Sequence, residues 1–418
     1  MKMSRSQTKR SLPALKLGLI SLIDDKSNTA TSVTTNGTSQ LRDNSIGQRH
    51  TRWTRYAIAT VLVIQLVCVA IHAVRSSPTN DEFGHFFAGI RYWEQGDTRI
   101  FNVNPPLVRS IAAIPAVIGW DHSVVAPLKG FEVRAARPEM QAGRRLFSAM
   151  PNEFHFYLVL GRLLVGMFGL MGTMAIFSWG RQLVGDWGAV VAASFWAIQP
   201  QIIAHGSLIT NDVPVAACMT LAAWLFCRWC ESPSISRALL GGAGLGLATV
   251  CKFTALLLWP IFLVFAVYEI WRHRSLVRLY QAIIAIIVAF VVVGIPYGFA
   301  GIGRPIKSFD LVTDYRAPDQ ILDPAWQNRF GDRWVGYLPS PLPEEYVVGI
   351  DRQQSDFVNG LPSYAAGQKS KHGWWWFYLY SMAVKLPTGT WLAIAVAMIY
   401  WASGQAKITR DRLMVILI

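Results

Sequence analysis

The 418-residue chain is 52% hydrophobic and only 15% charged, and its mean hydropathy is +0.31. This composition excludes an ordinary soluble globular protein, because about a quarter of the residues in such proteins are charged. Lysine and arginine number 39 against 25 acidic residues, which gives a formal net charge of +14. These charges lie mostly between apolar runs, so we attribute them to membrane topology and expect no nucleic-acid partner.

The chain begins with a basic segment that is rich in serine and threonine. It lacks the layout of a cleavable signal peptide, because the first long apolar run starts only at Tyr56. We interpret residues 1–55 as a disordered cytoplasmic tail.

Long apolar runs follow the tail. A membrane core of about 30 Å requires about 20 apolar residues in a helix. The sequence predicts about eight such spans, and the cleanest are residues 56–74, 156–179, 253–271 and 279–299. The stretch 187–230 predicts two more spans on either side of a polar turn at 205–212, and a shorter one is expected at 238–250. The five cysteines lie in or beside these runs and are expected to be small core residues.

The last apolar region, residues 374–403, is too long for one upright crossing. Pro387 offers a break, and three tryptophans at 374–376 favour the headgroup level of a membrane. We therefore expect an interfacial helix at 374–385 and a span that begins near Pro387. Residues 404–418 are interpreted as a cytoplasmic loop followed by the start of a further, truncated span.

Short loops rich in lysine and arginine predict the orientation, because such loops stay on the cytoplasmic side. The basic turns fall at alternate ends of consecutive spans. This pattern places the N-terminus in the cytoplasm and two long loops, residues 75–155 and 300–373, on the opposite face. Loops of this length are commonly functional.

Two acids follow the first span. Asp81 and Glu82 lie in the first turn of a predicted helix that is capped by Thr79 or Asn80. Such acids also compensate the helix dipole, but at a membrane boundary an unneeded carboxylate is costly. His85 lies on the same helical face as Asp81, where it can orient that carboxylate or ligate a divalent metal with it.

The order of short motifs becomes informative beyond this helix. An Asp-Glu pair, the Gly-Asp at 96–97 and the Asn104-Pro-Pro-Leu sequence resemble the first external loop of the GT-C glycosyltransferases. The resembling branch contains the protein O-mannosyltransferases and the lipid A aminoarabinose transferases. Further matching motifs follow in the family's order: Gly161-Arg162-Leu163-Leu164, residues 208–214, residues 247–252, residues 372–378 and Lys385-Leu386-Pro387. The resemblance covers residues 56–403.

The resemblance implies an all-α polytopic membrane protein with a GT-C-like bundle and two external loops that contain interfacial helices. It also implies transfer of a sugar from a polyprenyl-phosphate donor to a protein or lipid acceptor on the non-cytoplasmic face, with inversion. Asn104 replaces a lysine of the aminoarabinose branch, so that sugar is not expected. The second loop is too short for the β-trefoil domain of eukaryotic relatives, which favours a bacterial inner-membrane enzyme.

Site roles follow from the chemistry of this transfer. An acceptor hydroxyl needs a base, for which Asp81 with its neighbour Glu82 is the candidate. A leaving polyprenyl phosphate needs cations, and the candidates are Arg162, Lys252, Lys385 and His372. His85, Asn104 and Asp212 are expected to contact substrate.

Several of these residues also have structural interpretations. Arg162 can anchor its helix by reaching the membrane interface, and Asp212 suits a helix N-terminus. A non-enzymatic lipid-linked-sugar binder or flippase would use the same cations without needing Asp81. A small-molecule transporter would place ionisable groups near the bilayer midplane, and the sequence lacks the internal repeat of many transporters.

Overall fold

The computed structural model describes residues 32–121, 138–311, 330, 333–360 and 363–403. The predicted tail up to residue 31 and the predicted loop at 404–418 lie outside the described residues. The chain divides into two units, Met1–Trp53 and Thr54–Ile418, and the helical bundle belongs to the second. Helix α1 runs from Ser32 to Arg75, so residues 32–55, which we expected in a disordered tail, are helical. No proline interrupts this stretch, and the helix therefore continues beyond its apolar part.

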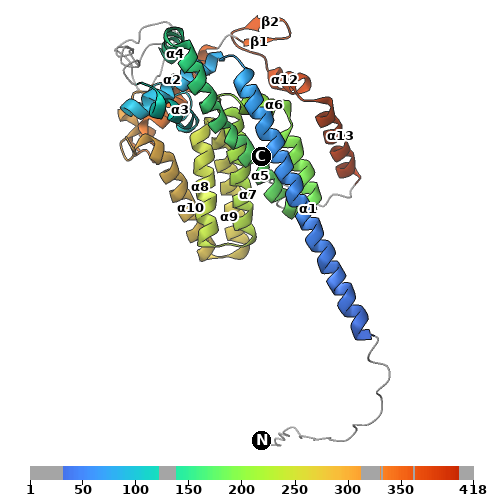
Figure 1. Cartoon of the computed structure of the whole chain (residues 1–418). Helices are drawn as coiled ribbons and strands as arrows, with labels where there is room; N and C mark the ends of the chain where they lie inside the picture. Colours follow the sequence, from blue (N-terminus) through green and yellow to red (C-terminus); the bar gives the residue numbers. More distant parts are fainter. Residues whose placement is uncertain (1–31, 122–137, 312–329, 331–332, 361–362, 404–418) are drawn as a thin grey trace, which may run out of the picture. The chain divides into compact units, whose positions relative to one another are not determined.

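The bundle is built from apolar helices (Figure 1). Within the described residues, five stretches are long and apolar enough to cross a membrane: Arg52–Arg75 in α1, Pro151–Ala197 (α5), Asp212–Glu231 (α7), Phe253–His273 and Leu276–Tyr297. The fourth consists of η3 (Phe253–Leu257) and α9 (Leu258–His273), and the fifth of α10 (Leu276–Gly294) and η4 (Ile295–Tyr297). This arrangement confirms the expected all-α polytopic membrane protein.

Helix α5 folds back on itself. Its backbone turns at Gly185, which has a φ of 78°, a value that side chains with a Cβ disfavour. The second half returns along the first, and the indole of Trp196 donates to the carbonyl of Gly169 at 3.0 Å. The predicted spans at 156–179 and in the first part of 187–230 are the two arms of this hairpin. The short helix α6 (Pro200–Gly206) continues the second arm after a break at Gln199.

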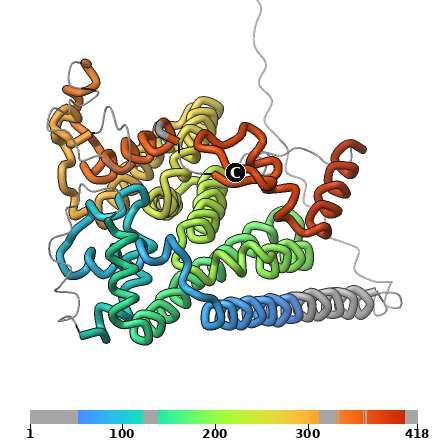
Figure 2. The backbone as a smooth tube through the Cα atoms, turned by 90° about the horizontal axis from the view of Figure 1, so that it is seen from above, coloured from blue at the N-terminus to red at the C-terminus, as the bar shows by residue number. Residues whose placement is uncertain are grey.

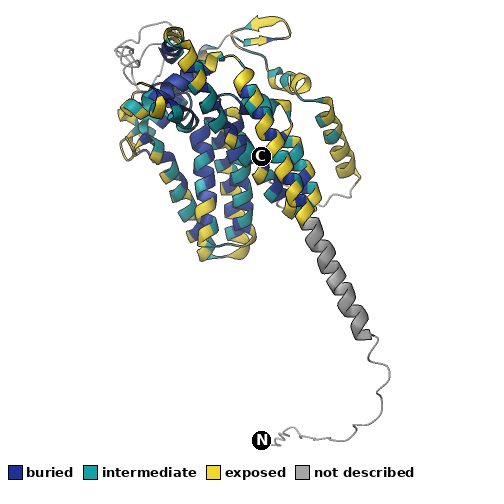
Figure 3. Ribbon diagram, in the orientation of Figure 1, coloured by how far each residue is buried: buried dark blue, intermediate teal, exposed yellow. Residues whose placement is uncertain are grey.

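The centre of the bundle consists of closely packed helices. The short apolar helix α8 (Ile235–Cys251) contacts both α7 and α10. A Cβ on Gly242 would lie 2.2 Å from the carbonyl oxygen of Ala285, so only glycine permits this approach. Four of the five cysteines are buried, as expected, while Cys68 is half-buried. Figure 3, coloured by burial, shows buried residues on the inner faces of these helices and exposed residues on their outer faces.

In its described parts, 76–121 and 138–150, the first long loop between α1 and α5 contains three helices. They are α2 (Asn80–Gln95), α3 (Leu107–Gly119) and α4 (Pro138–Ala149). Helix α2 lies against both of the others, and a Cβ on Gly89 would lie 2.2 Å from the carbonyl oxygen of Arg109. The end of the bundle that carries this loop is termed the loop end below.

The second long loop follows η4. It contains η5 (Ile306–Ser308), η6 (Trp334–Tyr337), α11 (Glu344–Asn359) and a small antiparallel hairpin of β1 (Ser363–Ala365) and β2 (Gln368–Ser370). In the hairpin, Ser363 is opposite Ser370. Tyr346 of α11 packs its ring against Phe253 and Tyr297, so this loop also lies at the loop end.

The chain then forms α12 (Phe377–Lys385) and α13 (Thr388–Ala402), which meet at an angle of 108°. The break falls at Leu386 and Pro387, as the sequence predicted. If α12 and α13 are counted together as one bent span, the described residues contain six candidate spans instead of five. Figure 2 shows both helices on the outside of the bundle.

The basic turns gather at the end opposite the loop end. Arg181 lies just before the fold of α5, Arg228 and Arg237 flank the α7–α8 turn, and Arg272 and Arg278 flank the α9–α10 turn. This separation of basic turns from long loops agrees with the pattern on which the orientation is based.

Candidate functional site

The start of α2 is fixed by a reciprocal cap. Thr79 is the N-cap residue, in extended conformation, and Glu82 occupies the third helical position. The Glu82 carboxylate accepts hydrogen bonds from the backbone N–H of Thr79 at 2.8 Å and from its hydroxyl at 3.0 Å. This capping arrangement satisfies backbone donors that helix formation leaves open.

Glu82 also forms an ion pair with Arg162 from the first arm of α5. Both side chains are completely buried, and Arg162 donates to the two carboxylate oxygens of Glu82 at 2.7 Å each. The remaining N–H groups of Arg162 donate to the carbonyls of Ala73, Ser76 and Ser77 at 2.7 to 2.9 Å. All five donors of the guanidinium are therefore used within the chain.

This geometry argues against phosphate binding by Arg162 and against a catalytic role for Glu82. Arg162 has no N–H left for a lipid phosphate, and its guanidinium is completely buried between helices instead of extending to the outer surface of the bundle. The carboxylate of Glu82 accepts from Arg162, Thr79 and the backbone N–H of Ile209. It has no open position for an acceptor proton. We therefore assign both residues to holding the ends of α1, α2 and α5 together.

Asp81 differs from Glu82 in its exposure and in its contacts. Its side chain is exposed, and within the described residues it has no hydrogen bond or ion pair. Because Glu82 is anchored, the first turn of α2 is held in place and Asp81 is presented from a rigid support. An exposed, unpaired carboxylate on a fixed helix start can accept a proton from a bound hydroxyl.

The turn between α6 and α7 connects this helix start to a second polar group. The backbone N–H of Ile209 donates to Glu82 at 3.0 Å. Two residues later, the amide of Asn211 donates to the carbonyl of Cys251, at the end of α8. The turn therefore bridges the start of α2 and the end of α8, which lie far apart in the sequence.

Three ionisable residues cluster at this bridge: His205, Asp212 and Lys252, which are termed the Asp212 cluster. The ammonium of Lys252 lies 2.7 Å from one carboxylate oxygen of Asp212, and Nδ1 of His205 lies 3.8 Å from the other. Lys252 is the extended residue between α8 and η3, and Asp212 opens α7. The side chains of Asp212 and Lys252 are 50% and 28% exposed, so both remain accessible to a ligand.

The other predicted substrate contacts are less open. His85 is buried, and its ring meets that of Phe101 edge-on at 4.3 Å between centroids. Asn104 is half-buried, and its backbone carbonyl accepts from Arg109 at 2.7 Å. Among the residues that the structure describes, no three His, Cys, Asp or Glu side chains gather closely enough to hold a metal ion.

Sequence reasoning missed Arg109. This residue of α3 is completely buried, and it donates to the carbonyls of Phe101 and Asn104 at 2.6 and 2.7 Å. Burial lowers the pKa of Arg109 to about 10, so the guanidinium stays charged at neutral pH. It thereby holds residues 98–104 over α3. The sequence does contain a signal for this residue, because Arg109 is the one charged residue in the apolar run 107–119.

The two long loops meet at Asn102. Its amide donates to Glu345 of α11 at 3.2 Å, and its carbonyl oxygen accepts from Arg352 at 3.1 Å. Burial raises the pKa of Glu345 above its ordinary value. A Cβ on Gly349 would lie 2.1 Å from the backbone carbonyl of Asn102, so α11 lies directly on the first loop.

The two remaining predicted cations lie on the last segment of the chain. The side chains of His372 and Lys385 are exposed and have no hydrogen bond or ion pair among the described residues. Lys385 is the last residue of α12, at the break before α13. The described contacts do not join either residue to the Asp212 cluster, so the structure does not bring these cations into the site.

The class of protein follows from this fold and these residues: an integral membrane protein whose ionisable groups gather at one end of an apolar helical bundle. Residues 152–297 match the family model of the dolichyl-phosphate-mannose-protein mannosyltransferases. The matched segment is about a third of the chain and includes Arg162 and the whole Asp212 cluster. Over this segment the match confirms the resemblance that the motifs indicated, and Asp81, Asn104 and Lys385 lie outside it. It supports a membrane glycosyltransferase of the GT-C type. No curated protein and no solved structure matches the chain significantly.

Proposed function

We propose that the protein transfers a sugar from a polyprenyl-phosphate donor to a hydroxyl of a protein or lipid acceptor, on the non-cytoplasmic face of a bacterial inner membrane. The observation that carries this proposal is the exposed carboxylate of Asp81 on an anchored helix start, connected through Glu82 and Ile209 to the Asp212 cluster. The family match of residues 152–297 supports the same chemistry.

In the proposed reaction, Asp81 accepts the proton of the acceptor hydroxyl as its oxygen attacks the anomeric carbon. The bond between that carbon and the phosphate oxygen breaks on the opposite side, so the configuration inverts. The electron pair of the broken bond remains on the polyprenyl phosphate. The ammonium of Lys252 stabilises the charge that develops there, while Asp212 holds the ammonium in position.

The location of Lys252 supports its assignment to the phosphate. Positive charge at the loop end is not favoured by the topology, because the other short basic turns lie at the opposite end. The ion pair with Asp212 is partly exposed and contributes little stability by itself. A lysine retained there is therefore better explained by an anionic ligand than by folding. His372 and Lys385 are proposed as further cations that approach this phosphate when donor binds.

The role of Lys252 can be tested by donor binding. We expect Lys252→Ala to weaken the binding of polyprenyl phosphate by about 10- to 100-fold, because one charge-assisted hydrogen bond is lost. Lys385→Ala should weaken it in the same direction. The measurement is the affinity of purified protein in detergent for polyprenyl phosphate, with Lys369→Ala in the exposed hairpin strand β2 as the control.

The outcome also separates the enzyme from its rivals. Equal affinity of Lys252→Ala and the unchanged protein would return this lysine to a structural role. A lipid-linked-sugar binder or flippase would lose affinity in the lysine variants, yet Asp81→Asn would leave its function intact. A small-molecule transporter would be insensitive to polyprenyl phosphate altogether.

A further inference from the structure

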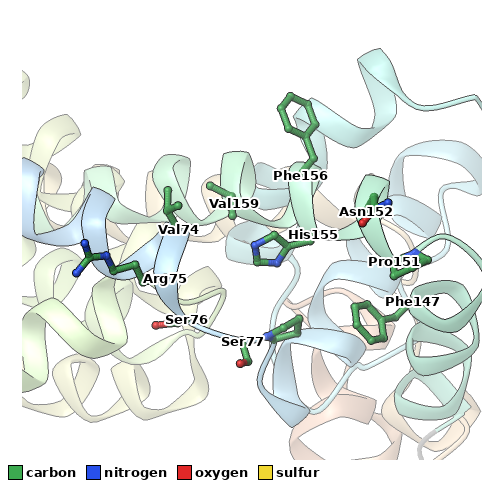
Figure 4. A pocket seen from close by; sticks show the side chains of 11 residues that line it. Val74, Arg75, Ser76, Ser77, Phe147, Pro151, Asn152, His155, Phe156 and Val159 are labelled. Atoms are coloured by element: carbon green, nitrogen blue, oxygen red, sulfur yellow. The ribbon is translucent and has the colours of Figure 1, made fainter.

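A pocket of about 630 Å³ lies outside the Asp212 cluster, where α1 ends and α5 begins. It is lined by residues 74–78 of the first connection, by Phe147 of α4 and by the first turns of α5. Figure 4 shows His155 in the middle of this lining, with Asn152 on one side and Arg75 at the rim on the α1 side, where its guanidinium points away from His155. The volume lies in the range of small-molecule sites.

Three polar side chains of this pocket are not used by the fold. Arg75, Asn152 and His155 have no hydrogen bond or ion pair among the residues that the structure describes, whereas the hydroxyl of Ser76 is hydrogen-bonded to His72. No acidic residue lines the pocket, and Glu153, which follows Asn152 in the first turn of α5, is exposed. A cationic and amide lining without an acid is complementary to an anion.

The back of the pocket is rigid. The carbonyls of Ser76 and Ser77 face away toward Arg162, which holds them at 2.8 and 2.9 Å. The segment 76–77 therefore lines the pocket on one side and binds Arg162, the partner of Glu82, on the other. This support keeps Arg75 and the neighbouring backbone in place without a ligand.

An apolar stripe runs along α1 away from the pocket. The exposed side chains of Val63, Val67, Ile71 and Val74 recur at helical spacing on one face of the helix. At 1.5 Å per residue, this stripe is about 16 Å long, which equals roughly half of a 30 Å membrane core. A single leaflet of lipid has the same depth, and the pocket lies at its headgroup end.

We propose that this pocket binds the phosphate headgroup of an anionic bilayer phospholipid whose acyl chains lie along the exposed stripe of α1. The long side chain of Arg75 turns inward from the rim to contact the phosphate. His155 and Asn152 contact the phosphate from α5, and Val74 and Phe156 contact the first methylene groups. The site is distinct from the Asp212 cluster, so the inference is independent of the proposed sugar transfer.

The test compares phosphatidylglycerol with phosphatidylcholine as probes for the full chain in detergent, with retained lipid measured by native mass spectrometry. We expect preferential retention of phosphatidylglycerol. Arg75→Ala should reduce that preference about five-fold, since one surface cation near anionic lipid contributes about this much. Asn152→Lys, which adds a cation, should increase it. Arg55→Ala, an exposed arginine at the other end of the same span, is the matched control.

Four results would overturn the proposal. The first three are equal retention of the two lipids, an unchanged preference in both pocket variants, and an equal loss in Arg55→Ala. Displacement of phosphatidylglycerol by equimolar polyprenyl phosphate, with the same dependence on Arg75, would also overturn it and assign the pocket to the sugar donor. Because Asn152→Lys predicts a gain, a general loss of folding does not imitate the expected result.

Discussion

Asp81→Asn is expected to abolish sugar transfer and to leave polyprenyl-phosphate binding unchanged. The carboxylate is exposed and unpaired within the described residues, so its replacement by an amide of the same size removes a base without disturbing packing. Proton transfer by a positioned base contributes about 10²- to 10⁴-fold to a rate, and we expect a loss of at least about 10²-fold.

The measurement uses polyprenyl-phosphate mannose, labelled in the sugar, as the donor probe and membranes from cells that lack the gene as the source of acceptor. Asp186→Asn at the opposite end of the bundle is the control, because among the described residues that carboxylate pairs with Arg181 near the fold of α5 and with no other charged group. Transfer by the Asp81→Asn variant at the rate of the unchanged protein would remove Asp81 from the reaction.

The second large effect concerns the buried ion pair. Arg162→Ala leaves the carboxylate of Glu82 buried without its partner and opens three backbone carbonyls, so we expect a loss of about 3–5 kcal/mol in stability. Arg162→Lys should also destabilise the protein, because an ammonium cannot replace five donors in a planar fork. Glu82→Gln should act in the same direction.

Thermal unfolding of the purified protein in detergent measures this effect. Arg181→Ala, which breaks an exposed pair at the other end of the bundle, should change stability by about 1 kcal/mol or less. If Arg162 instead bound the donor phosphate, Arg162→Lys would lower donor affinity while the unfolding temperature stayed the same. These two results together would contradict the structural role of Arg162.

Most of the fold was predictable from apolar length alone. The spans, the helix capped by Thr79 and the break at Pro387 follow from run length, capping residues and proline geometry. These signals are local, so the sequence carries them directly. The break in α5 at Gly185 falls between two predicted spans, whereas the extension of α1 to Ser32 is less visible, because residues 32–51 lack an apolar run.

The site was harder to predict because its roles depend on distant partners. Asp81 and Glu82 are adjacent acids with the same local signal, yet one is exposed and the other is buried against Arg162. The two acids differ because Arg162 of α5 pairs with Glu82, and Arg162 is 80 residues away along the chain. The pairing of Asp212 with Lys252 and the joining of the two loops by Asn102 are non-local for the same reason.

We propose that Asp81 and the Asp212 cluster form one site that consumes a polyprenyl-phosphate sugar. Mass spectrometry of glycolipids and glycoproteins tests this proposal most directly, in cells that carry the intact gene, no gene, or the Asp81→Asn variant. We expect one glycoconjugate to disappear in both altered strains while a polyprenyl-phosphate sugar accumulates. An unchanged glycoconjugate profile in the Asp81→Asn strain, with the variant protein present in the membrane, would contradict it.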